Sequence, residues 1–350
     1  MVDVVVVVLG AVVVVVLLGA VVLVLVAVVF VGGLFVELVA AVAVGLFVLE
    51  DVAVAARAGL LVELIAAVAT GTLLVLEDVA VAARAGLLVE LVPTVATRAL
   101  LVLENAPVAT RARLLVELVP TMTAGTLLVL ENAPVTAGRG LLVELVPTVT
   151  TGTLLVLEDV PTAATRARLL VELVPTVATR ALLVLEDVSH AAAGGRLLVE
   201  LVPAVPAGTL LVLEHVTVVA GRRLLVELVA AAAGALLVLE DVTTATRGGL
   251  LVELVPTVPA RALLVLEDVT TATRGGLLVE LVPTVTTGTL LVLEDVTTAA
   301  GRSLLVELVA PTGALLVLED VPRAPRRSLL VELVPTGTAG TLLVLENVAR

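Results

Sequence analysis

One unit of about 27 residues recurs along this chain and restricts the fold more than any other feature. Each unit carries an LLVEL block and, half a unit later, an LLVLE block. A fixed period of this size is typical of solenoids and strand arrays, in which each unit buries its apolar surface only against its neighbours. The repeat predicts an architecture and leaves the activity open. The glutamates of the first series are Glu37, Glu63, Glu90, Glu117, Glu144, Glu172, Glu200, Glu227, Glu253, Glu280, Glu307 and Glu332. Those of the second series are Glu50, Glu77, Glu104, Glu131, Glu158, Glu186, Glu214, Glu240, Glu267, Glu294, Glu319 and Glu346.

The repeated blocks read as β-strands. They are five to seven residues long, which is shorter than the ~10–12 residues of a stable helix. Proline follows many LLVELV blocks, and it cannot donate a hydrogen bond to a neighbouring strand. We therefore expect strands that end at or near these prolines, joined by spacers rich in Thr, Gly, Ala and Arg. The prolines are Pro93, Pro120, Pro147, Pro175, Pro203, Pro256, Pro283 and Pro335.

The predicted fold class is all-β, a tandem-repeat β-solenoid of about twelve 27-residue coils. The alternative is an antiparallel β-meander, in which each spacer is a hairpin turn and LLVEL pairs with LLVLE. Both arrangements place glutamates opposite one another, and two such charges ~5 Å apart in water repel by roughly 1 kcal/mol. The full unit repeats more faithfully than the half unit, which favours the solenoid.

Strand geometry predicts which side chains point outward, because successive residues alternate between the two faces. In Leu141–Val146 (LLVELV), the glutamate shares a face with the second leucine and the last valine, and we expect this face to be outside. In the LLVLED blocks the alternation puts Glu and Asp on opposite faces. The outward face of those blocks therefore stays open.

An apolar segment, residues 1–32, precedes the repeat array of residues 33–350. Residues 4–31 form an uninterrupted apolar run that exceeds the ~20 residues needed to span a bilayer. Three interpretations stay open: a membrane anchor, β-structure continuous with the array, and translation of a compositionally biased nucleotide tract. Valine is β-branched and suits the second of these.

Composition argues against several kinds of partner. The net charge is −13 and the chain has no lysine, so it lacks the basic patches that nucleic acid requires. Cysteine is absent, which excludes disulfides and thiol chemistry. The only aromatic residues are Phe30, Phe35 and Phe47, and such side chains supply much of the energy of specific binding.

No group of residues predicts a catalytic, cofactor-binding or metal site. His190 follows Asp187 and Ser189 closely, but a catalytic triad depends on spatial geometry and an oxyanion hole. Both His190 and His215 stand where other units have Thr, Asp or Asn, which indicates spacer substitution. Stacked Glu–Asp pairs could attract calcium, yet the expected opposite orientation of each pair argues against it. We expect no enzyme and no cofactor.

The predicted function is that of a non-enzymatic structural or surface-display repeat protein. One alternative is a translated GC-rich tandem repeat with no evolved function, because most of the favoured residues have GC-rich codons. Another is a membrane β-barrel, since twenty-four blocks is an even number, although the girdles of Tyr and Trp typical of barrels are missing. We expect edge-to-edge self-association and a membrane contact through residues 4–31. Localisation follows from that contact: membrane-associated or exported if the run is an anchor, and otherwise open.

Overall fold

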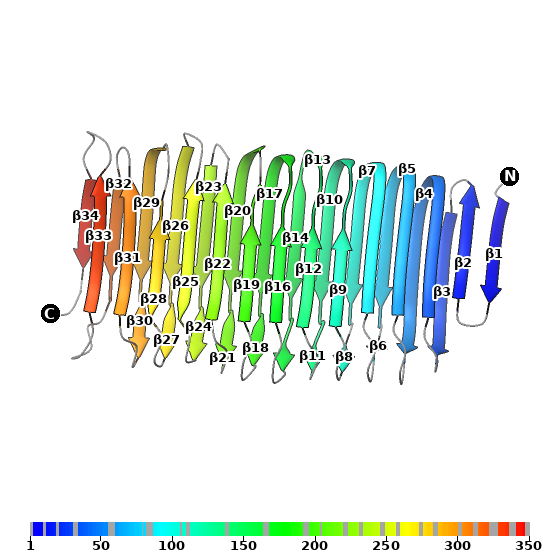
Figure 1. The fold of residues 1–350 in the computed structure, drawn as a ribbon, viewed down its shortest axis with the longest axis horizontal. Helices are drawn as coiled ribbons and strands as arrows, with labels where there is room; N and C mark the ends of the chain where they lie inside the picture. Colours follow the sequence, from blue (N-terminus) through cyan, green and yellow to red (C-terminus); the bar gives the residue numbers. More distant parts are fainter. Residues whose placement is uncertain are drawn as a thin grey trace.

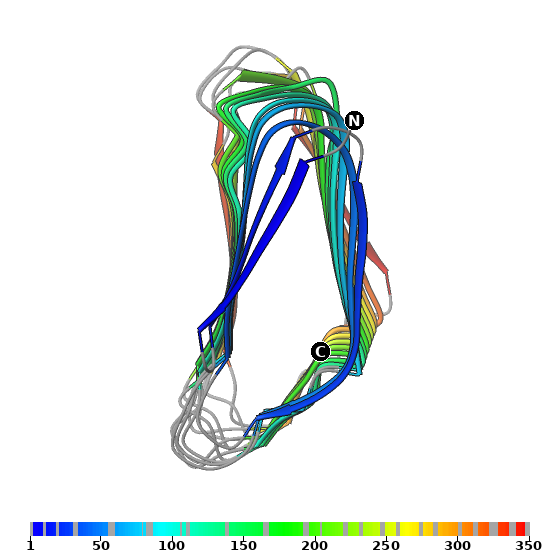
Figure 2. The same cartoon turned by 90° about the vertical axis from the view of Figure 1, so that its right-hand side faces the viewer.

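Strands account for every regular element of the described chain, and they stand side by side along one long axis (Figure 1). The computed structural model runs from β1 at one end to β33 and β34 at the other. Seen along this axis, the strands form two long walls, which curve into each other at one end (Figure 2). The all-β prediction is confirmed.

The structure describes most of the chain between residues 3 and 346. The described residues are 3–9, 12–18, 21–30, 34–54, 60–78, 80–81, 87–105, 107–109, 113–136, 140–163, 168–191, 196–203, 205–219, 223–230, 234–245, 249–256, 260–272, 276–282, 286–299, 303–310, 314–321, 328–335 and 341–346.

Each coil contributes an LLVEL strand to the first wall and an LLVLE strand to the second wall, and in most coils the described residues include a short third strand after it. Near the N-terminus the two wall strands of a coil merge into one bent strand in β5 (Leu60–Glu77) and β7 (Leu87–Glu104). In β4 (Leu34–Val54) the third strand is merged as well, since Ala53 and Val54 pair with residues 80–81 of the next coil. The separate first-wall strands are β9 (Arg113–Leu118), β12 (Gly140–Leu145), β16 (Arg168–Leu173), β19 (Arg196–Leu201), β22 (Arg223–Ala230), β25 (Leu250–Pro256), β28 (Leu277–Leu281), β31 (Ser303–Ala310) and β33 (Ser328–Pro335). The separate second-wall strands are β10 (Met122–Glu131), β14 (Thr153–Glu158), β17 (Val177–Glu186), β20 (Val205–Glu214), β23 (Gly234–Glu240), β26 (Ala260–Glu267), β29 (Thr286–Glu294), β32 (Ala314–Glu319) and β34 (Thr341–Glu346). The third strands are β6 (Ala80–Val81), β8 (Val108–Ala109), β11 (Val135–Thr136), β15 (Thr162–Ala163), β18 (Ser189–Ala191), β21 (Thr217–Val219), β24 (Thr243–Ala245), β27 (Thr270–Ala272) and β30 (Thr297–Ala299). A further short strand, β13 (Val149–Thr150), lies between β12 and β14 in the chain and pairs with β10 and β17.

Equivalent strands of successive coils pair in parallel and with like residues opposite. On the first wall Glu144 pairs with Glu117 and Glu172, and on the second wall Glu158 pairs with Glu131 and Glu186. The β-solenoid is therefore confirmed, and the array does not form the antiparallel meander. A column is used below for the set of residues at one equivalent position in successive coils.

The burial pattern confirms the outward face predicted for LLVEL. In β12 the side chains of Leu141, Val143 and Leu145 are buried in the core, whereas Leu142 and Glu144 are partly exposed. The buried members of each wall meet in one continuous hydrophobic core. Since apolar burial is worth about 25 cal/mol per Å², this repeated interior is the main stabilising contribution to the array.

Most of the first-wall strands that are followed by a proline end at or near it, as predicted. The strands β9, β12, β16 and β19 each end two residues before a proline, and β25 and β33 end on one. The exception is β7, which runs through Pro93 opposite Ala66. Proline there loses only its donor, and its carbonyl oxygen still accepts a hydrogen bond from the Thr121 N–H at 3.1 Å.

The N-terminal apolar run forms β1 (Asp3–Leu9), β2 (Val12–Leu18) and β3 (Val21–Phe30). The strands β2 and β3 pair in parallel with β4, while β1 and β2 form an antiparallel pair. Residues 31–33, at the boundary expected between the two segments, lie outside the described residues. Within the described part of the chain, the structure has no helix whose length and apolar character would let it cross a membrane.

Candidate functional site

Polar side chains recur most regularly at the end of each second-wall strand. The residue after its glutamate has a positive φ in ten successive coils, between 47° and 53°. Asp, Asn and His tolerate this left-handed conformation better than other residues that carry a Cβ atom. The column is Asp78, Asn105, Asn132, Asp159, Asp187, His215, Asp241, Asp268, Asp295 and Asp320. We call it the corner column.

The left-handed residue changes the direction of the chain and interrupts the strand alternation. Leu155 and Leu157 point into the core and Glu158 outward, as in an ordinary strand. Asp159 should then point inward, but it is exposed, and Val160 is buried in its place. The expectation that Glu and Asp of one pair face opposite sides is therefore wrong, because it assumed a continuous strand through the aspartate.

Hydrogen bonds between coils hold the corner. The backbone N–H of Asn132 donates to the carbonyl oxygen of Glu158 at 3.2 Å, and that of His215 donates to Glu240 at 3.2 Å. The corner column was not predicted as a structural unit. The sequence nonetheless contains a pattern that indicates it, because Asp, Asn or His follows the LLVLE block in unit after unit.

An open groove of about 980 Å³ follows the corner over five coils. One side is the corner column from Asp78 to Asp187, and the other is formed by the residues two positions later. These second-side residues are Ala80, Pro107, Pro134, Pro161 and Ser189. The groove thus combines carboxylate and amide groups with rigid proline rings.

Several carboxylates lie close together beside this groove, and the pKa of Glu158 among them is raised. Partial desolvation raises the pKa of Glu158, and the charges of Glu131, Glu186, Asp159 and Asp187 raise it further. A nearby like charge disfavours ionisation, so Glu158 releases its proton less readily than an isolated glutamate does.

The first wall shows the same effect with fewer charges. Desolvation raises the pKa of Glu144, and the charge of Glu172 in the next coil adds to the shift. The other first-wall glutamates whose pKa is raised by desolvation and by a neighbouring glutamate are Glu117, Glu172, Glu227 and Glu280. Parallel stacking in register therefore works against full ionisation on both walls.

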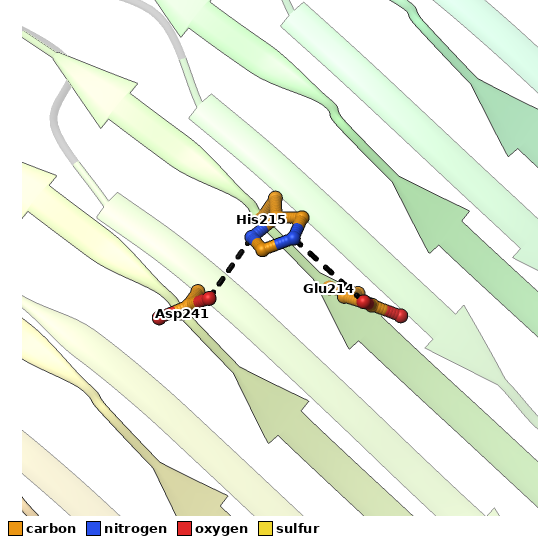
Figure 3. Close-up of polar contacts among 3 residues, drawn as sticks. All are labelled: Glu214, His215 and Asp241. Atoms are coloured by element: carbon orange, nitrogen blue, oxygen red, sulfur yellow. Dashed lines mark ion pairs between the residues drawn. The ribbon is translucent and has the colours of Figure 1, made fainter.

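His215 introduces a basic side chain into the acidic corner (Figure 3). Its Nδ1 lies 3.0 Å from Oδ2 of Asp241 in the next coil, and its Nε2 lies 3.7 Å from Oε1 of Glu214. The imidazole and the Asp241 carboxylate are each nearly half exposed. This geometry can balance charge between coils, and it leaves both groups open to water.

The residues that resemble a catalytic triad, Asp187, Ser189 and His190, lie along the corner and the third strand β18. The backbone of His190 pairs with Thr162 and Val218, and its side chain lies outside the described part. Asp187 is an exposed member of the corner column, and Ser189 is partly buried on the far side of the groove. Among the residues that the structure describes, no group of three or more His, Asp or Glu side chains is arranged to hold a metal ion.

No family model, no curated protein and no solved structure matches this chain.

Proposed function

We propose that this chain is a non-enzymatic structural repeat protein that displays regular side-chain columns on a rigid rod. The observation that carries the proposal is the stacking of like residues over the whole array, from Glu37 opposite Glu63 to Glu307 opposite Glu332. Each coil buries its apolar face against the next, and its outer face repeats at the strand spacing of ~4.8 Å. A scaffold of this kind supports periodic display.

Detection of the protein in its source cells tests whether it has such a role. We expect mass spectrometry to find the chain in quantity, in the surface or envelope fraction. A transcript without any protein, in repeated samples, would contradict the proposal. That result would instead support a GC-rich tandem repeat that is translated without an evolved function.

We further propose that residues 4–31 contact a membrane. The run contains no charged residue, while the rest of the chain supplies a charge of −13 that disfavours anionic lipid. The full chain should float with vesicles of neutral phosphatidylcholine, and substitution of Val14 and Val24 by Arg should abolish flotation. Arg at Val177, whose side chain is 47% exposed, is the control and should leave flotation unchanged. Equal flotation of all three proteins would contradict the membrane contact.

The coil formed by β33 and β34 supports self-association. Leu343 and Leu345 are 39% and 53% exposed, whereas the equivalent Leu316 and Leu318 of the preceding coil are fully buried. Exposed apolar strand edges favour pairing with another chain. We propose that a second copy covers this surface.

Light scattering of the full chain tests this self-association. The average mass should rise with concentration, and Leu345→Lys should weaken the increase. Val219→Lys changes a side chain that is 41% exposed in the middle of the array, and should have no effect. A monomer at all concentrations, or equal assembly of both variants, would exclude this contact.

A further inference from the structure

A second hollow lies on the outer face of the second wall, away from the corner groove. Four neighbouring strands, β17, β20, β23 and β26, form its floor. Arg180 of β17 is opposite Gly208 of β20, and Gly234 of β23 is opposite Arg261 of β26. The hollow has a volume of about 460 Å³. Its size falls within the ~300–1,000 Å³ range of small-molecule sites.

The hollow exists because two consecutive members of an outward-facing column are glycines. A Cβ atom added to Gly208 or Gly234 would meet no other atom within 4 Å. Next to the glycines lies a column of half-buried leucines, which gives the hollow an apolar wall. These leucines are Leu182, Leu210, Leu236 and Leu263.

Each end of the hollow carries a positive charge. Arg180 and Arg261 line it and are exposed, and no carboxylate is among the residues that line it. The second-wall glutamates lie six residues further along each strand, as Glu186 does from Arg180, which is ~20 Å at 3.3 Å per residue. Neither arginine forms an ion pair with any residue that the structure describes. Within the described part of this acidic chain, both guanidinium groups are therefore without a carboxylate partner.

We propose that this hollow binds a linear aliphatic carboxylate of medium chain length. The alkyl chain would lie along the leucine column over the two glycines, and the carboxylate would accept hydrogen bonds from Arg180 or Arg261. Guanidinium matches carboxylate geometry with two parallel donors. Arg180 and Arg261 are three strand spacings apart, or ~14 Å, so this span sets the length of chain that the hollow accommodates.

Titration of the full chain with laurate, below its micelle concentration, tests the inference. Valine at Gly208 and Gly234 would place its Cβ atom in open space and its methyl groups in the hollow. It should weaken laurate binding roughly tenfold or more, because it excludes the alkyl chain. Glutamine at both Arg180 and Arg261 should also weaken binding about tenfold, since a charge-assisted hydrogen bond is lost. Dodecanol, which has the same chain and no charge, should bind the unmodified protein more weakly than laurate.

Two matched variants keep the test specific. Gly71→Val fills equally open space outside this hollow, and Arg223→Gln removes an arginine from the first wall; both should bind laurate as the unmodified chain does. A laurate derivative that carries a photoreactive group near the middle of its chain should label peptides from β20 and β23. Undiminished laurate affinity in the glycine variant, equal affinity for dodecanol, or labelling spread evenly over the coils would each overturn the proposal.

Discussion

Nδ1 of His215 lies 3.0 Å from Oδ2 of Asp241, at a position where the flanking coils place Asp187 and Asp241. The histidine thus separates two carboxylates that would otherwise belong to an uninterrupted acidic series. Its backbone has the same left-handed conformation as its neighbours, with φ of 50°. Histidine in place of aspartate therefore changes the charge at this position without changing the backbone conformation of the corner.

Replacing His215 with Asp should destabilise the array slightly at neutral pH and low ionic strength. The corner column would then carry an uninterrupted run of seven aspartates, from the coil of Asp159 to that of Asp320. We expect a loss of up to about 1 kcal/mol in the free energy of unfolding, because the site is exposed to solvent. The loss should vanish in 1 M salt, where the Debye length is ~3 Å. His215→Asn keeps the backbone preference and adds no charge, so the difference between its denaturation midpoint and that of the unmodified chain should change little with salt. Equal salt dependence of the two variants would contradict this account.

The left-handed corner predicts opposite effects for two substitutions of Asp159. Its φ of 48° suits glycine and is unfavourable for a β-branched residue. Asp159→Gly should leave the free energy of unfolding within ~1 kcal/mol of the original value, whereas Asp159→Val should lower it by about 1–3 kcal/mol. Urea denaturation measures both. Equal stability of the two variants would show that the corner is not left-handed in solution.

Acidic solution should stabilise the array. The pKa of Glu144 is raised in the folded chain above its ordinary value of 4.5. The stabilising contribution is therefore fully present below the pKa of the unfolded chain, and it is lost as the pH rises through the higher folded pKa. The free energy of unfolding should fall between pH 4 and pH 8.

Glu144→Gln should accordingly raise stability at pH 8 and have little effect at pH 4. Glu332→Gln is the control, because Glu332 is exposed and pairs with a glutamate of only one coil, so it should change stability less. A protein that becomes more stable as the pH rises would contradict the predicted sign.

The face assignment of the second wall predicts a large difference between neighbouring leucines. Leu157 is fully buried, so Leu157→Ala should cost roughly 2–5 kcal/mol. Leu154 is partly exposed on the outer face, so Leu154→Ala should cost much less. Guanidinium denaturation of both variants decides the point, and a larger loss for Leu154 would reverse the inside and outside of this wall.

Thr289 predicts a stabilising substitution inside the core. Its Oγ1 atom is buried and has no hydrogen-bond partner among the residues that the structure describes, and the residues paired with it in the flanking strands are Ala262 and Ala314. A buried unsatisfied hydroxyl costs ~1–3 kcal/mol. Thr289→Val removes the hydroxyl and keeps the shape, so it should raise the free energy of unfolding by about 1 kcal/mol. A loss of stability would indicate that Oγ1 has a partner in solution.

Much of the fold was predictable because the period of two within each block matches the strand. The alternation in Leu141–Val146 correctly placed Glu144 outside, since a single extended strand has only two faces. The hollow between Arg180 and Arg261 was not predicted from the sequence. Arg180 and Gly208 are 28 positions apart, and only the register between β17 and β20 makes them neighbours.

Local spacing and side-chain polarity were enough to predict that the chain forms short strands, that the repeated unit stacks, and that one glutamate series faces solvent. The parallel pairing of the coils became clear only from their packing in three dimensions, since hairpin and solenoid both place glutamate opposite glutamate. Their packing also set the outward position of Asp159 and the inward position of Val160. A left-handed backbone residue resets the alternation, and its effect appears only once the chain has turned the corner and packed against the next coil.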